Sequence, residues 1–133
     1  MSQRLARVAL VVPDYDAALD FFGGVMGFAT VEDTDHGDGR RWVVVAPPGG
    51  KGAELLLARA ATPAQRAAIG NQTGGRVFLF LETDAFDRDL ARLSAAGVHI
   101  EAPPRHEPYG RVVVFRDPFG NRWDLIEPAP APL

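Results

Sequence analysis

The sequence contains no cysteine, little serine and no long hydrophobic run. Without cysteine the protein has no disulfide, no thiolate metal site and no cysteine nucleophile. Its only serines are Ser2 and Ser94, and neither stands in the Gly-x-Ser-x-Gly pattern of serine hydrolases. No apolar run approaches the roughly 20 residues of a membrane-spanning helix. The first apolar run ends at Pro13-Asp14 without a small-residue cleavage site, which predicts a strand rather than a signal peptide.

The sequence also lacks an excess of basic residues. The chain has 14 Lys and Arg residues against 17 Asp and Glu residues, for a net charge of −3, and the two signs are interspersed. This distribution lacks the basic footprint of a nucleic-acid partner or of a helix on a membrane surface. Hydrophobic residues at 47% and charged residues at 23% are typical of a soluble globular protein. Together with the lack of cysteine, this leads us to expect a cytoplasmic protein.

The chain repeats itself. RWVVVAPPGGKGAELLLA, which starts at Arg41, aligns without a gap with RVVVFRDPFGNRWDLIEP, which starts at Arg111. Glu54 then falls on Asp124, so each copy carries one acid inside an apolar last strand. Such an acid is a metal ligand, half of an ion pair, or a residue on a solvated face.

The repeat extends upstream, because ALVVPDYDAALDFF matches FLETDAFDRDLARL. Each copy therefore predicts one strand, one helix and three further strands. Strands are expected near residues 7–12, 29–34, 41–46, 53–58, 77–82, 99–102, 111–116 and 122–127, and helices near 15–25 and 86–96. We expect a single domain with module one over residues 5–60, a linker with a short helix over 61–75, module two over 76–128 and a frayed tail over 129–133.

These motifs, above all VALVVPDYDAALDFF and DPFGNRWDLIE, resemble the vicinal oxygen chelate superfamily, the glyoxalase, bleomycin resistance and extradiol dioxygenase family. The resemblance covers about Leu5 to Glu127. It implies an α+β fold in which two tandem βαβββ modules curl their sheets around a cleft. It also implies a homodimer, which exposed sheet edges favour as well.

Active members of the family hold a divalent metal with four inward residues, one in the first and one in the last strand of each module. By resemblance these positions fall on Arg7 and Glu54 in module one, and on Phe78 and Asp124 in module two. Phe78 has no lone pair, and Arg7 stays protonated and repels a cation. A register slip of one residue replaces Phe78 with Val77 and restores no histidine.

We therefore expect Arg7 to stand in for the charge of the metal. A buried Arg7 paired with Glu54, Asp124 or both would satisfy the acids, provided that their hydrogen bonds are made. Two carboxylates and water could still hold a hard ion such as Mg²⁺ or Mn²⁺, but the adjacent arginine disfavours this. We expect the acids to face the cleft.

Other candidates for ligand contacts are aromatic or lie near the cleft rim. Trp42, Phe78 and Phe80 could line a pocket, although aromatic residues in strands more often belong to the core. His106 and Tyr109 lie in a segment that we expect to be a loop before a strand, where functional side chains often occur.

Three classes of function remain open. The first is a glyoxalase/bleomycin-resistance-like protein that binds a small, largely apolar molecule without cofactor. The second is a metal-dependent lyase, isomerase or dioxygenase that uses Glu54 and Asp124. The third is a metal-free enzyme, with Arg7 as electrophile and Glu54 or Asp124 as base. The missing metal ligands favour the first class.

Overall fold

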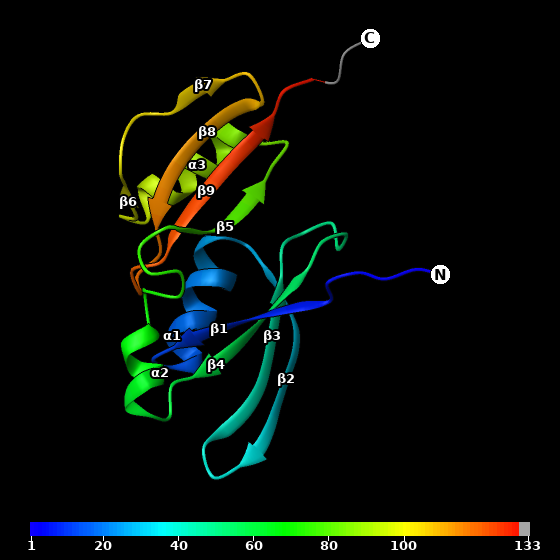
Figure 1. Cartoon of the computed structure of the whole chain (residues 1–133), viewed down its shortest axis with the longest axis vertical. Coiled ribbons are helices and arrows are strands. Elements are labelled where there is room, and N and C mark those ends of the chain that lie inside the picture. Colours follow the sequence, from blue (N-terminus) through cyan, green and yellow to red (C-terminus); the bar gives the residue numbers. More distant parts are fainter. Residues whose placement is uncertain (131–133) are drawn as a thin grey trace. The chain divides into compact units, whose positions relative to one another are not determined.

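The computed structural model describes residues 1–130 and divides the chain into two compact units, Met1–Ile69 and Gly70–Leu133. The division falls inside the connector that the sequence predicts over residues 61–75. The last three residues of the expected tail, 131–133, lie outside the described residues. Each unit is described separately below, with the element labels of Figure 1.

The first unit is one βαβββ module followed by a short helix. Its elements are β1 (Arg7–Val12), α1 (Tyr15–Leu19), the π-helix η1 (Asp20–Val25), β2 (Ala29–Gly37), β3 (Arg40–Ala46), β4 (Glu54–Arg59) and α2 (Pro63–Ala68). The sheet has the order β1-β4-β3-β2, in which β1 and β4 are parallel and the other pairs antiparallel. This confirms the strand, helix and three strands expected for module one.

The predicted helix over residues 15–25 changes its form halfway. Asp14 caps α1 by accepting a hydrogen bond from the Ala17 amide at 2.8 Å. From Asp20 the helix continues as a π-helix, and the Met26 amide donates to the Phe21 carbonyl five residues back. The wider π-helical turn lies where two consecutive side chains, those of Phe21 and Phe22, are both buried.

The second unit repeats the module with one added strand. Its elements are β5 (Val77–Glu82), α3 (Phe86–Ala95), β6 (His99–Ile100), β7 (Arg105–Glu107), β8 (Gly110–Arg116) and β9 (Arg122–Pro128). The sheet order is β5-β9-β8-β6, and β7 pairs with β8. The sequence predicted a longer β6 and a loop where β7 lies. His106 is thus in a strand, paired with Arg111, and not in the expected loop.

In each sheet, the face toward the helix forms the core. On the α1 side of the first sheet the buried residues are Leu10, Val12, Val43, Val45, Leu55 and Leu57. On the α3 side of the second sheet they are Val113, Phe115, Trp123 and Leu125. The opposite faces carry the two repeated acids and keep several half-exposed apolar residues. Alternation along each strand therefore places Glu54 and Asp124 on the face away from the helix of their own unit.

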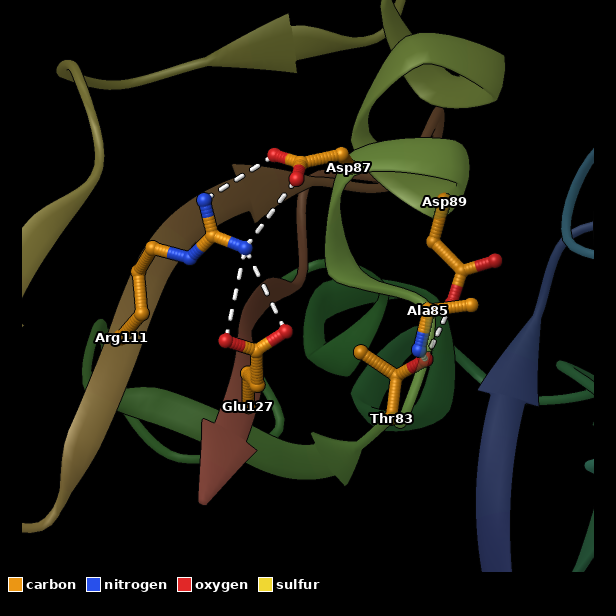
Figure 2. Close-up of polar contacts among 6 residues, drawn as sticks. All are labelled: Thr83, Ala85, Asp87, Asp89, Arg111 and Glu127. Carbon is orange, nitrogen blue, oxygen red and sulfur yellow. Dashed lines mark hydrogen bonds and ion pairs between the residues drawn. The ribbon is translucent and has the colours of Figure 1, made fainter. Parts of the chain in front are cut away.

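Arg111, near the start of β8, links α3 to the sheet of the second unit. The Arg111 guanidinium donates to Asp87 in the first turn of α3 at 3.0 Å and to Glu127 of β9 at 3.3 Å, as Figure 2 shows. It also lies over the Phe86 ring, 4.2 Å from its centroid. In the first unit, Arg41 makes the equivalent pair with Asp16 at 2.9 Å. The internal sequence repeat is therefore accompanied by equivalent ion pairs in the two units.

None of the helices within residues 1–130 is both long enough and apolar enough to cross a bilayer.

Candidate functional site

Asp124 is the buried acid of the second unit. It lies in the middle of β9, between Phe80 of β5 and Val114 of β8. The residue is 8% exposed, and its Oδ1 atom is buried without a hydrogen-bond partner among residues 1–130. A buried carboxylate oxygen without a partner is costly, so this atom is available to accept a hydrogen bond from a ligand.

The surroundings of Asp124 act on its charge in opposite directions. Burial raises the pKa of the Asp124 carboxyl, because the ionised form loses hydration. The positive charges of Arg105 and Arg122 lower this pKa, and the negative charge of Glu101 raises it. Burial has the largest effect, so the pKa lies above its usual range. The group can therefore change between an acceptor and a donor of hydrogen bonds at a higher pH than an ordinary aspartate.

Asp124 lines an open hollow of about 570 Å³ in the second unit. The other lining residues are Gly75, Arg76, Val77, Phe80 and Arg122. Phe80 was a candidate for a ligand pocket, with the core as the alternative, and the structure leaves it 64% exposed. The hollow thus combines one buried acid, one exposed aromatic ring and two arginines.

The structure brings Val77 and Phe80, rather than Phe78, to Asp124. A bulge between Val77 and Leu79 shifts the register of β5 against β9, so that Phe80 pairs with Asp124. Phe78 instead lines a second, smaller hollow. The residue-by-residue match placed Phe78, two residues before Phe80, opposite the acid. In a regular strand the two rings would share one face, and the bulge removes Phe78 from the face that carries Phe80.

The hairpin of β7 and β8 supplies Arg105, which the sequence analysis missed. Arg105 pairs with Val112 and is close enough to Asp124 for their charges to interact. A hydrogen bond with Tyr109 is the largest cause that raises the pKa of Arg105. Tyr109 is 53% exposed in the turn before β8, and His106 is exposed in β7. Neither lines the hollow beside Asp124.

Arg122 could have been found from the sequence. It lies two residues before Asp124 in a predicted strand, and alternation puts both on one face. Arg105 had no such signal, because β7 was not predicted.

The first unit pairs its acid with Arg7, as expected. The Arg7 Nε atom lies 3.1 Å from Glu54 Oε1, and the two residues face each other across β1 and β4. The side chain of Arg7 is 44% exposed, however, so the expectation of a buried arginine was wrong. Arg7 lies on the edge strand β1, where solvent reaches it. Trp42, on the same face of the sheet, is 37% exposed and does not belong to the core.

Neither unit alone offers the donors of a typical metal site. Within residues 1–130 no three histidine or acidic side chains gather as a possible ligand group. The Glu54 carboxylate is already in contact with a guanidinium, and the charges of two arginines act on Asp124. A divalent ion would have to compete with these fixed positive charges. The donor sets within the single units therefore do not fit a tightly held metal.

Comparison with known proteins identifies the family. The model of the Glyoxalase/Bleomycin resistance protein/Dioxygenase superfamily matches residues 4–125. An uncharacterized protein of Shewanella frigidimarina is 51% identical over 128 residues, which are 96% of this chain and 95% of the relative. The crystal structure of UcmS2 has a TM-score of 0.80 at 28% identity and covers 96% of this chain and 99% of its own. That of TnmS3, an antibiotic binding protein from Streptomyces sp. CB03234, has a TM-score of 0.75 at 32% identity and covers 97% and 98%. The chain therefore belongs to the Glyoxalase/Bleomycin resistance protein/Dioxygenase superfamily, the vicinal oxygen chelate superfamily.

Proposed function

We propose that this protein binds a small, largely apolar molecule in the hollow beside Asp124, without a metal ion. The observation that carries the proposal is the pairing of a buried, unpartnered carboxylate oxygen with an exposed aromatic ring. A buried polar atom without a hydrogen-bond partner is uncommon in folded proteins, and a bound ligand is one explanation for it. A ligand with an apolar body and one hydrogen-bond donor would satisfy both groups.

The chemistry of the hollow defines the ligand. Phe80 and Val77 offer apolar contacts, and a ring stacked on Phe80 would contribute about 0.5–1.5 kcal/mol beyond the area that it buries. Asp124 Oδ1 would accept a hydrogen bond from a hydroxyl or N–H group of the ligand. The few polar groups fix orientation and the apolar surface supplies affinity, as in most small-molecule sites.

The relatives support binding as the role of the fold. TnmS3, at 32% identity over nearly the whole of both chains, is described as an antibiotic binding protein. The ion pair of Arg7 with Glu54 supports ligand binding without a metal ion, because it occupies one of the two carboxylates, Glu54 and Asp124, that could hold the ion. We also propose a homodimer, since β2 and β5 are edge strands with exposed residues. The lack of cysteine leads us to propose a cytoplasmic location as well.

A ligand screen with matched variants tests this function. Aromatic and polycyclic compounds that carry one hydroxyl group would be titrated calorimetrically into the protein before and after treatment with EDTA. We expect binding that EDTA leaves unchanged and that Phe80→Ala weakens about tenfold or more through the loss of ring contacts. Val31→Ala, which truncates a 48% exposed side chain of β2, is the matched control and should have no effect.

Two outcomes contradict the proposal. One is a stoichiometric metal ion in the purified protein whose removal abolishes binding. The other is a ligand whose affinity is the same in the wild type, Phe80→Ala and Asp124→Asn.

A further inference from the structure

A second hollow in the second unit is lined by three arginines. It has a volume of about 60 Å³ and lies where the turn after α2, the start of β5 and the turn between β8 and β9 meet. Its charged lining residues are Arg76, Arg116 and Arg122. The space is large enough for a few waters or one small polyatomic ion, and too small for an organic ring system.

The arginines outnumber the carboxylates around this hollow. Glu101 accepts hydrogen bonds from Arg122 Nε at 2.7 Å and Nη2 at 3.0 Å, and from Arg116 Nε at 3.1 Å. These contacts lower the pKa of the Glu101 carboxyl, chiefly through the hydrogen bond with Arg122, so it remains ionised at neutral pH. Within residues 1–130, Glu101 is the only carboxylate that makes an ion pair with any of the three guanidinium groups, and the negative charge of Asp124 also acts on Arg122.

Donors for a further anion remain unused. The third nitrogen of Arg122, Nη1, donates to the Gly75 carbonyl at 3.1 Å, so each nitrogen of Arg122 already makes one hydrogen bond. The two terminal nitrogens of Arg116 and the whole guanidinium of Arg76 have no hydrogen-bond partner in the described part of the chain. Guanidinium groups bind carboxylate and phosphate oxygens through paired N–H groups, which matches this arrangement.

The internal repeat shows that the module does not need these arginines to fold. In the first unit, the positions equivalent to Arg116 and Arg122 are Ala46 and Gly52. Both copies nevertheless join their last two strands by a turn, from Ala46 to Glu54 in the first unit and from Arg116 to Arg122 in the second. The positive charge is therefore specific to the second unit, where Glu101 pairs with Arg116 and Arg122 and leaves Arg76 without an ion pair within residues 1–130.

We propose that this hollow binds a small oxyanion, a carboxylate or phosphate group, held by Arg76 and by the terminal nitrogens of Arg116. Arg122, fixed by Glu101 and Gly75, contributes charge from the wall of the hollow. The site shares Gly75, Arg76 and Arg122 with the hollow beside Asp124. The oxyanion is either a free ion or the acidic group of a molecule whose apolar body lies on Phe80. The proposal depends on the arginines alone and does not require the proposed function.

Titration with inorganic phosphate tests the site. Amide chemical shifts of the full chain would be followed by NMR at pH 7, against sodium chloride of equal ionic strength. We expect saturable shifts at Gly75, Arg76 and Asn121, with a Kd that rises about tenfold in Arg76→Gln and in Arg116→Gln. Arg66→Gln removes the same charge from an exposed arginine of α2 and should leave the Kd unchanged.

Three results would overturn the site. These are shifts that chloride reproduces, equal weakening in all three variants, and a Kd that Arg76→Gln leaves unchanged. Circular dichroism of each variant verifies that it folds. The Arg76 side chain makes no ion pair within residues 1–130, so its replacement is the variant expected to fold normally.

A second titration identifies the source of the anion. Naphthalene-1-carboxylate and acetate carry the same charged group, and only the former has an aromatic body. In one outcome the naphthalene compound binds more tightly than acetate, and Phe80→Ala removes this difference but leaves phosphate binding unchanged. This result supports the site and assigns it to the acidic group of the ligand. Equal affinity for the two carboxylates supports a site for free anions. Failure of both carboxylates and of phosphate to bind overturns it.

Discussion

At the scale of single residues, burial of the Asp124 carboxyl is unfavourable for stability but suits the ligand contact that we propose for it. Burial makes its ionised form unfavourable, whereas the charges of Arg105 and Arg122 favour ionisation. Two arginines that share one face with the acid do not complete its hydrogen bonds, because Oδ1 remains without a partner among residues 1–130. A buried polar atom of this kind is retained against its cost, which is expected for a group that meets a ligand.

The raised pKa predicts how Asp124 affects stability. The folded state favours the protonated acid, so Asp124 lowers the free energy of unfolding as pH rises from about 3.8 through its raised pKa. Asp124→Asn removes the charge, and we expect it to stabilise the protein by about 1 kcal/mol at pH 7. The difference between variant and wild type should shrink toward pH 3, as measured by urea denaturation at several pH values. A destabilisation of equal size at every pH contradicts this.

At the scale of elements, one turn organises the end of the second sheet. Asp117, which is 4% exposed, accepts hydrogen bonds from the Phe119 and Asn121 amides at 3.0 Å each. It also accepts from Asn121 Nδ2 at 2.9 Å and from the indole N–H of Trp123 at 3.0 Å. The turn therefore fixes the direction in which β9 leaves it, and with it the placement of Asp124.

Removal of this carboxylate should be among the most damaging single changes. We expect Asp117→Ala to lower the free energy of unfolding by about 3 kcal/mol or more, because it leaves buried donors without partners. Asp14→Ala, which removes one helix-capping bond, should cost only about 1 kcal/mol. Urea denaturation measures both, and equal effects would show that the turn does not depend on Asp117.

At the scale of the whole molecule, the free edges of the two sheets bear on assembly. The edge strand β2 has every residue exposed, and β5 is an edge strand of the second sheet. Exposed strand edges are commonly covered by a second copy of the chain. The proposed homodimer would give such cover.

Light scattering after size exclusion tests the homodimer. We expect a mass about twice the 14.3 kDa of one chain at micromolar concentration. A mass of one chain at all concentrations would exclude the homodimer and would leave the hollow beside Asp124 as a site within a single chain.

The repeat in the sequence determined most of the architecture. The aligned acids Glu54 and Asp124 predicted that the last strands of the two modules are equivalent. The order of a strand, a helix and three strands holds in both units. The pair of Arg7 and Glu54 was expected from the family resemblance, which places both residues at ligand positions of one module, and the structure pairs them across β1 and β4. Such features depend on local pattern and alternation, which a sequence displays directly.

Only the tertiary structure decided which side chains surround Asp124. The bulge in β5 turned Phe78 away, the register of β5 against β9 placed Phe80 beside the acid, and the unpredicted β7 brought Arg105 near it. The three arginines of the smaller hollow come from segments that are separated in sequence and meet only in the folded second unit. Register shifts and the meeting of distant segments depend on the packing of whole sheets, and no local pattern encodes them.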